Sequence, residues 1–427
     1  MADGGLPSFF SFIVFDSGLC LSMFERKFIM KRTVGTVVRG LRAPVIHEGD
    51  DLAQIVVDSL LGASQQANFS IDDRDVLAIT ESILARAQGN FSNLNIVAQD
   101  IQDKLQSNTI GVVFPIMSRN RFQSTLKAIA RAAEHVIIQL SYPSDEVGNP
   151  LMLIEDLDAH DINPWTDVFT EAEIKALFPD LKHPFTGVDY LQLYRDTVES
   201  EGAKCTIILA NQPKAILDYS STIIASDLHT RFRTKQRLIN AGAELVFTLD
   251  DIMTESIEGS GCNPEYGLLG ANLSSDEVIK LFPVNGQDFV EDVQARIKDL
   301  TGKTIEVMIY GDGAFKDPQS HIWELADPIV SPAHTDGLKG TPDEVKLKYL
   351  ADGQFKDLSG QELQDAISNY LKQRTTSNQQ DQADRIGTTP RQLTDLLGSL
   401  ADLTSGSGDK GTPFIYVKGY FDKFSDQ

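Results

Sequence analysis

The chain has 427 residues, more than one average domain holds, and this length predicts two or three domains. Its 61 acidic and 38 basic residues give a formal net charge of −23, which argues against broad electrostatic contact with nucleic acid or anionic lipid. Cys20, Cys205 and Cys262 lack the Cys-x-x-Cys spacing of zinc and redox sites. We therefore expect a protein of the reducing cytoplasm, with neither nucleic acid nor membrane as a partner.

The first 29 residues differ from the rest of the chain. Their apolar run at 7–16 ends in Asp16, has no basic start or small-residue cleavage site, and is too short to span a bilayer. A cleaner strand pattern begins at Met30. We expect residues 1–29 to be a start-site artefact or a disordered or peripheral tail.

Residues 30–150 alternate between strand and helix patterns. Apolar runs predict strands at 34–40, 75–80, 110–118 and 135–140, and helical periodicity follows at 52–60, 81–90 and after Arg121. Arg119 and Arg121 stand where the third helix begins, and both guanidinium groups and helix-start amides favour anions. They are candidates for binding phosphate or carboxylate; a solvated helix start is the alternative.

Residues 151–270 continue the alternation. Helices are predicted at 171–178, 190–201 and 230–241, and strands at 205–210, 221–225 and 244–248. This pattern favours an inserted α/β subdomain. The whole chain lacks the Walker spacing of a P-loop, so any nucleotide site is of another type.

In residues 271–427 a predicted helix at 289–300 precedes an apolar strand at 304–310, which runs into Gly311-Asp312-Gly313. Two glycines allow a tight turn around one carboxylate, and strand ends are where ligands of α/β sheets usually lie. Since Mg²⁺ and Mn²⁺ prefer oxygen donors, Asp312 is a candidate metal ligand. An ordinary Gly-Asp-Gly turn is the alternative. Helices at 361–371 and 391–403 and a strand at 413–419 complete the chain.

Several blocks resemble the coenzyme F420-0:γ-glutamyl ligase family. The first is Pro44-Val45-Ile46 followed by Glu48-Gly-Asp-Asp-Leu-Ala53, and the second is Asp75-Val-Leu-Ala-Ile-Thr80 with Ala85-Arg-Ala-Gln-Gly89. Two lysines of the family pattern are Ser82 and Arg86 here, so one cationic phosphate contact is lost and the other is kept as a guanidinium. Both blocks line a GTP site in the family, which implies nucleotide contacts from Pro44, Val45, Ile46, Glu81, Ser82 and Arg86.

Two strand ends carry the resemblance further. The segment 141–150 is similar to the family's Asp-Glu-Ser-Asn motif, with Asp145 at the metal-binding aspartate and Asn149 at the asparagine that meets the nucleotide. One extra residue separates them here. Asp312 matches a second metal-binding aspartate, although Gly313 replaces the hydroxyl residue that follows it in the family. The resemblance therefore implies that Asp145 and Asp312 share Mg²⁺ or Mn²⁺.

The resemblance covers roughly half the chain and implies a two-lobed, mixed α/β ligase-like fold. We expect residues 30–150 to bind nucleotide and metal and residues 151–270 to form an insertion. Residues 271–427 are expected to form a second ligase-like part with C-terminal helices and a closing strand. The family reaction is attack of an acceptor carboxylate on the γ-phosphate of GTP, followed by displacement of phosphate by the amine of L-glutamate. It needs charge compensation that Arg86, Arg119 or Arg121 supplies, and a homodimer is expected. Alternatives are glutamate addition to folate or another acceptor, and a non-catalytic nucleotide-binding protein on the same fold.

Overall fold

The computed structural model describes residues 34–119, 121–184, 186–311, 330–342, 347–374, 392–405 and 410–422. The chain divides into two units, one of residues 36–342 with 388–421 and the other of residues 1–35, 343–387 and 422–427. Every described strand belongs to the first unit. Residues 1–29 and Asp312, both subjects of predictions, lie outside the described residues.

A five-stranded sheet forms the part of the first unit that contains both ends of its sequence. Strands β2 and β12 at its centre are parallel, and the other neighbours are antiparallel. The order across the sheet is β1 (Val37–Leu41), β14 (Phe414–Lys418), β2 (Val76–Thr80), β12 (Glu306–Gly311) and β13 (Val330–His334).

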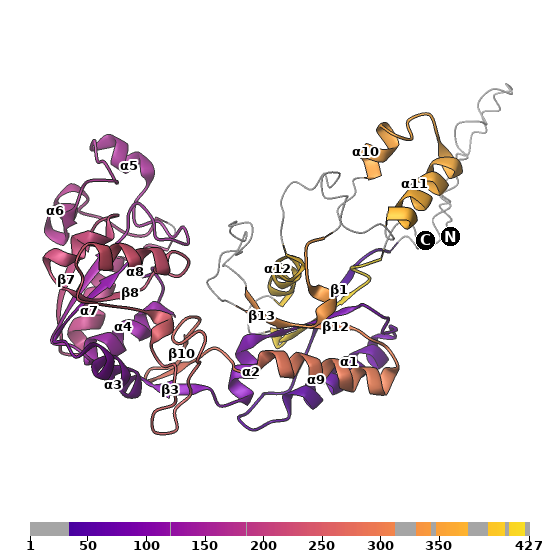
Figure 1. Cartoon of the computed structure of the whole chain (residues 1–427), viewed down its shortest axis with the longest axis horizontal. Coiled ribbons are helices and arrows are strands. Elements are labelled where there is room, and N and C mark those ends of the chain that lie inside the picture. Colours follow the sequence, from indigo (N-terminus) through magenta and orange to yellow (C-terminus); the bar gives the residue numbers. More distant parts are fainter. Residues whose placement is uncertain are drawn as a thin grey trace, which may run out of the picture. The chain divides into compact units, whose positions relative to one another are not determined.

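Helices cover both faces of this sheet (Figure 1). Side chains alternate along each strand, so Leu77 and Ile79 pack with α1 (Leu52–Ala67) and α9 (Gly286–Thr301). The side chains between them, at Val76 and Ala78, pack with α12 (Leu393–Ser405) on the other face. A strand that is buried on both faces is apolar throughout, which explains the continuous apolar run at 76–79.

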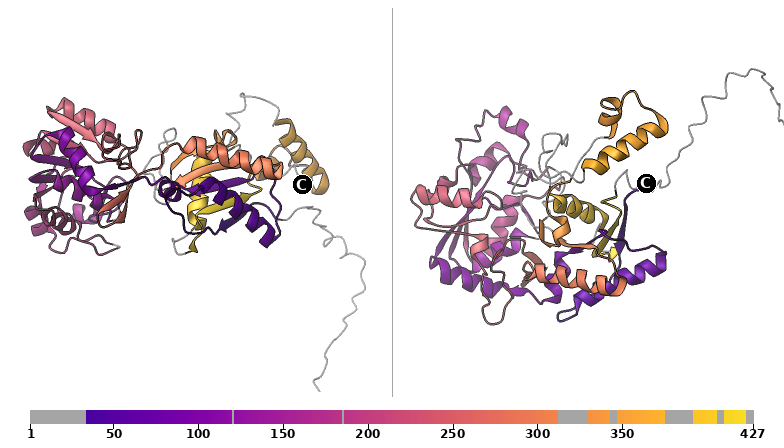
Figure 2. Two further views of the ribbon diagram at one scale, coloured as in Figure 1. Left: turned by 90° about the horizontal axis from the view of Figure 1, so that it is seen from below. Right: turned by 45° about the vertical axis from the view of Figure 1, so that its right-hand side comes forward.

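The second sheet has six strands, of which all but β6 are parallel to their neighbours. Its order is β6 (Phe169–Thr170), β7 (Lys204–Leu209), β5 (His135–Leu140), β4 (Thr109–Val113), β8 (Thr222–Ala225) and β9 (Leu245–Thr248). One face packs with α3 (Leu94–Leu105), α4 (Phe122–Arg131) and α7 (Tyr190–Ser200), and the other with α8 (Arg231–Asn240) and the 3₁₀ turn η1 (Pro213–Asp218). The helices around these strands can be followed in two further views (Figure 2). Strands from both sides of residue 150, where the sequence analysis sets a domain boundary, thus share one sheet.

A small antiparallel sheet of β10 (Asn272–Ser275), β11 (Val278–Lys280) and β3 (Phe91–Asn93) completes the first unit. These strands were not predicted, because three or four residues are too few to show a period of two. The helix α3 was also missed, although its 12 residues bury one face at Leu94, Val97, Ile101 and Leu105. The short helices are α2 (Glu81–Ala87), α5 (Ile154–Ala159) and α6 (Glu171–Leu177), with the 3₁₀ turns η2 (Leu249–Asp251) and η3 (Asp336–Leu338).

The other unit contains α10 (Leu347–Asp352) and α11 (Gly360–Arg374). The mixed α/β fold class is confirmed. Among the described residues, no helix combines the length and the apolar character that crossing a bilayer requires.

Candidate functional site

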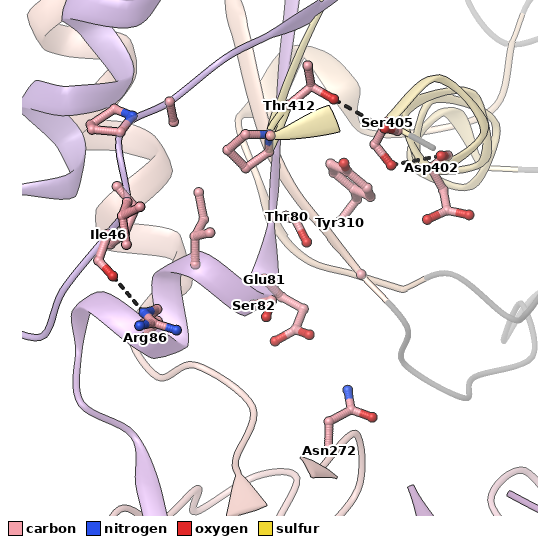
Figure 3. Close-up of a pocket in the computed structure, with 17 residues that line it drawn as sticks. Ile46, Thr80, Glu81, Ser82, Arg86, Asn272, Tyr310, Asp402, Ser405 and Thr412 are labelled. Carbon is pink, nitrogen blue, oxygen red and sulfur yellow. Dashed lines mark hydrogen bonds between the residues drawn. The ribbon is translucent and has the colours of Figure 1, made fainter. Parts of the chain in front are cut away.

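A pocket of about 540 Å³ lies at the carboxyl ends of β2 and β12, where the central parallel strands of the five-stranded sheet end side by side (Figure 3). Its remaining walls are the loop after β1, the first two turns of α2, the end of α12 and the segment that leads into β14. The pocket is lined by Ala43, Pro44, Val45, Ile46, Thr80, Glu81, Ser82, Ile83, Arg86, Asn272, Tyr310, Gly311, Asp402, Ser405, Gly411, Thr412 and Pro413.

This lining brings together six of the seven positions for which the sequence resemblance implies nucleotide contacts. They come from two blocks, the 44–46 loop and α2, that are separated in sequence by α1 and β2. Asn149, the seventh, is not among the lining residues. The two blocks with the clearest family resemblance therefore share one cavity.

Close contacts hold these two blocks together. The Nε of Arg86 donates a hydrogen bond of 2.6 Å to the carbonyl of Ile46, and the N–H of Gly49 donates to the carbonyl of Ala87 at 2.9 Å. Gly89 has a φ of +64°, and a Cβ there would lie 2.5 Å from the Cδ of Glu48. Glycine is thus required at 89 both for backbone conformation and for space.

The guanidinium of Arg86 is exposed and is anchored only through its Nε. Its two Nη groups make no hydrogen bond or ion pair within the described part of the chain, and they belong to the pocket lining. A guanidinium fork that is oriented at one nitrogen and open at the other two suits a phosphate or carboxylate.

Glu81 is the buried acid of the pocket, and its charge is compensated by Lys280 of β11. The Nζ of Lys280 lies 2.5 Å and 2.6 Å from the two carboxylate oxygens, and both side chains are almost fully buried. Gly311 packs directly on this acid, since a Cβ at 311 would lie 2.1 Å from the Cγ of Glu81. Sequence reasoning missed Lys280, because nothing in the short run 278–280 marks its lysine as a partner of a distant acid.

The C-terminal wall of the pocket was also absent from the predicted set. Ser405 Oγ donates to the carbonyl of Asp402 at 2.8 Å, and Thr412 Oγ1 donates to the carbonyl of Ser405 at 3.1 Å. The N–H of Thr80 donates to the carbonyl of Pro413 at 3.1 Å. The end of α12 is thereby connected, through the segment before β14, to the end of β2.

Asp145, predicted as a metal ligand, organises its own loop. Oδ2 accepts from the N–H of Met117 and the Nδ2 of Asn149, each at 2.8 Å, and Oδ1 accepts from the N–H groups of Val147 and Asn149 at 3.1 Å and 2.8 Å. These four bonds fill the acceptor sites of one carboxylate. Burial raises the pKa of Asp145, against the lowering effect of those donors.

In this arrangement the Asp145 carboxylate accepts four hydrogen bonds from its own surroundings, and its assignment as a metal ligand stays a prediction. Among the described residues, no three His, Cys, Asp or Glu side chains are grouped so that they would hold a metal ion. Asp312 lies outside those residues, so the predicted pair of metal aspartates stays a prediction.

Arg119 and Arg121 follow β4 and do not line the large pocket. Arg119 is exposed, and its charge lowers the pKa of Tyr190, although burial raises that pKa by more. The N–H of Arg121 donates to Ser118 Oγ at 3.2 Å, and its side chain borders a second cavity of only about 30 Å³. Their assignment as catalytic residues stays a prediction.

Comparison with known proteins gives one family. The family described as F420-0:Gamma-glutamyl ligase matches residues 40–419, which is most of the chain and includes every residue of the large pocket. The matched range also spans residues 151–270, where the sequence resemblance was not evident. No curated protein sequence matches the chain.

Proposed function

The chain belongs to the F420-0:γ-glutamyl ligase family, and we propose that it uses GTP to join L-glutamate to the carboxylate of an acceptor like coenzyme F420-0. The observation that supports this proposal is the pocket, which gathers the two family blocks around one oriented, open guanidinium. We propose that the enzyme acts as a homodimer in the cytoplasm.

The proposed reaction has two displacements. An oxygen of the acceptor carboxylate attacks the γ-phosphorus, the bond to the β,γ-bridging oxygen breaks, and GDP leaves. The neutral amine of glutamate then attacks the acyl carbon, the acyl–phosphate bond breaks, and the amide forms as phosphate and a proton are released. Neither step needs a side-chain nucleophile, so the protein contributes mainly alignment and charge compensation.

The residues of the pocket suit that task. Arg86 presents its Nη groups to an anion, and Lys280 cancels the charge of Glu81, which would otherwise repel a phosphate. The hydroxyl of Ser82 adds a neutral hydrogen-bond donor to the lining. The family pattern has a lysine where this chain has Ser82. An anion in this pocket can pair with Arg86 instead.

We include Mg²⁺ or Mn²⁺ in the proposal, because a divalent cation ordinarily accompanies a nucleotide triphosphate. Asp312 is the proposed ligand, and we propose that Asp145, whose carboxylate accepts four N–H hydrogen bonds, supports its own loop instead. Asp312→Ala is expected to abolish calorimetric Mn²⁺ binding in the presence of GDP and to reduce activity by orders of magnitude. Asp145→Asn is expected to lower the melting temperature while Mn²⁺ affinity is kept. Unchanged Mn²⁺ binding in Asp312→Ala would remove this assignment.

The direct test incubates the full chain with GTP, L-glutamate, Mn²⁺ and F420-0. Mass spectrometry is expected to find the acceptor enlarged by one glutamyl residue, with one GDP formed for each amide. Parallel reactions with folate and with ATP identify the acceptor and nucleotide. Nucleotide binding without an amide product from either acceptor would favour the non-catalytic alternative, and the absence of nucleotide binding would contradict the proposal.

A further inference from the structure

We infer that Asn272 is a catalytic residue: its carboxamide N–H donates to the acyl oxygen while the amine of glutamate attacks, an inference that rests on the proposed function. Asn272 is the first residue of β10 and is partly buried in the wall of the large pocket. Its Oδ1 is buried without a hydrogen-bond partner, and its Nδ2 makes no hydrogen bond with the residues that the structure describes. Figure 3 shows the side chain directed from β10 toward Glu81. The pocket thus contains an amide group that the described chain does not itself use.

This carboxamide lies beside two charges that compensate each other. Asn272 stands directly opposite Lys280 in the antiparallel ladder of β10 and β11, so both side chains are on one face of the small sheet, with Cβ atoms about 5 Å apart in such a pair. The Nζ of Lys280 in turn contacts both carboxylate oxygens of Glu81. Negative charge can therefore develop next to Asn272 without facing an uncompensated acid at Glu81.

The backbone that carries Asn272 is fixed by its neighbours. Ala271 is buried, and its N–H donates to the carbonyl of Leu268 at 3.1 Å. Gly270 has a φ of +71°, and a Cβ there would meet the ring of Phe282, so the chain is packed closely just before β10. A donor that is held in place before the reaction needs no reorganisation when charge develops on its acceptor.

The second displacement creates such a charge. When the neutral amine attacks the acyl carbon, an electron pair of the carbonyl bond moves to oxygen and gives a tetrahedral oxyanion. The carbonyl then re-forms as the bond to phosphate breaks and the nitrogen releases a proton. An N–H directed at this oxygen stabilises the oxyanion more than the carbonyl, and side-chain amides are among the groups that form oxyanion holes.

The position of Asn272 relative to Arg86 fits this role. Arg86 holds the phosphate in the proposed reaction, and Figure 3 shows Glu81 between Arg86 and Asn272. The acyl group of a phosphate at Arg86 is therefore placed on the side of Asn272. Among the other neutral donors of the lining, Ser405 and Thr412 already donate within the chain.

The stability of Asn272→Leu separates a catalytic from a structural asparagine. Leucine has a similar size, and the substitution removes an unsatisfied buried oxygen but no hydrogen bond of the described fold. The melting temperature is expected to stay the same or to rise, because an unpaired buried polar atom destabilises a protein. A melting temperature below that of the wild type would show that the carboxamide supports the fold and would overturn the inference.

Steady-state kinetics of the full chain with GTP, L-glutamate, Mn²⁺ and F420-0 measure the catalytic effect. The kcat of amide formation is expected to fall by about 100- to 1,000-fold in Asn272→Leu. The KM for glutamate and the calorimetric affinity for GDP are expected to stay near the wild-type values, because the hydrogen bond strengthens only in the transition state. Asn272→Asp keeps the shape without the donor and is expected to lose as much activity. Asn240→Leu, at an exposed position in α8, is the control and is expected to keep the wild-type kcat.

The first displacement is measured separately, with GTP that carries an oxygen-isotope label in the β,γ bridge. Reversible formation of the acyl phosphate and GDP from F420-0, without glutamate, moves the label into non-bridging positions of the β-phosphate. Attack of the carboxylate on phosphorus forms no oxyanion at carbon. Label exchange is therefore expected to continue in Asn272→Leu.

Loss of kcat with label exchange retained supports the inference. An unchanged kcat in Asn272→Leu would overturn it and leave the ligase proposal standing, and so would the loss of label exchange, weaker GDP binding, or a raised KM for glutamate at an unchanged kcat. These last three results would assign the carboxamide to the first displacement, to the nucleotide or to the amino acid. A wild type that neither exchanges the label nor forms the amide overturns the inference together with the proposed function.

Discussion

Lys280 and Glu81 are 199 positions apart in sequence, yet the ammonium nitrogen of Lys280 lies 2.5 Å and 2.6 Å from the two oxygens of the Glu81 carboxylate. Both side chains are buried. The pair connects β11 to the first residue of α2, at the wall of the large pocket. Because both charges are buried, loss of one side chain removes the ionic contact that offsets the desolvation of the other.

Lys280→Met is therefore expected to lower the free energy of unfolding by about 3–5 kcal/mol, as measured by urea denaturation. Lys303→Met serves as the control, because Lys303 and Asp73 form an exposed pair at 3.3 Å whose loss should have little effect on stability. In the double variant with Glu81→Gln, most of the loss is expected to be recovered. Equal losses at Lys280 and Lys303 would contradict a buried, interdependent pair.

Arg86→Ala is expected to weaken GDP binding by about 10- to 100-fold, because a charge-assisted hydrogen-bonding group is removed from the pocket. Arg86→Lys keeps the charge but has neither the Nε bond to Ile46 nor the fork, so an intermediate affinity is expected. Isothermal titration calorimetry measures both. Arg233→Ala, at an exposed position of α8, is the matched control, and equal affinity in Arg86→Ala and Arg233→Ala would rule out the phosphate role of Arg86.

Gly311→Ala is expected to destabilise the fold by about 1–3 kcal/mol, because the added methyl group would lie 2.1 Å from the Cγ of Glu81. The clash moves either Glu81 or the end of β12, so weaker GDP binding is expected as well. Gly62→Ala is the opposite case: it lies inside α1 with no atom within 4 Å of the new Cβ, and it should stabilise the protein by about 0.4–1 kcal/mol. Thermal and urea unfolding compare the two. A neutral Gly311→Ala would show that the Glu81 side chain relocates freely.

The environment of Asp227, which follows β8, predicts that the stability of the fold depends on pH. Its Oδ2 accepts from the hydroxyls of Thr230 and Thr234 at 2.6 Å and 2.7 Å, whereas the buried Oδ1 has no hydrogen-bond partner in the described part of the chain. Burial raises the pKa of this carboxyl to about 6 from an ordinary value of 3.8. At a pH between about 3.8 and 6, Asp227 is therefore mostly protonated in the folded state and mostly ionised in the unfolded state.

The stabilisation from this proton is complete below pH 3.8 and is lost as the pH rises through about 6. Asp227→Asn cannot ionise, so the stability of the wild type relative to this variant should fall by roughly 2 kcal/mol between pH 4 and pH 7, at 1.36 kcal/mol for each pKa unit and with the unfolded carboxyl already partly ionised at pH 4. Urea denaturation across that range measures the difference. A difference independent of pH would contradict the raised pKa.

The sequence by itself determined the elements whose periodicity repeats within a few residues. The apolar runs at 76–79 and 304–310 predicted strands at those places, and the structure has β2 and β12 there. The family blocks at 44–46 and 81–86 predicted residues that do line one pocket. Such signals are readable because side-chain periodicity and local motifs are properties of adjacent residues.

Only the tertiary structure decided which distant residues complete the site. Parallel pairing of β2 with β12 places Thr80 opposite Tyr310, and it brings Glu81 under Gly311. The contributions of Lys280 and Asp402 depend on the pairing of β11 and on the packing of α12, neither of which leaves a mark in the adjacent sequence. The same holds for Asp145, which the family resemblance implied as a metal ligand and whose carboxylate accepts four N–H hydrogen bonds within and beside its own loop. The sequence states which side chain stands at each position. Which groups donate hydrogen bonds to that side chain, or balance its charge, depends on the folded structure.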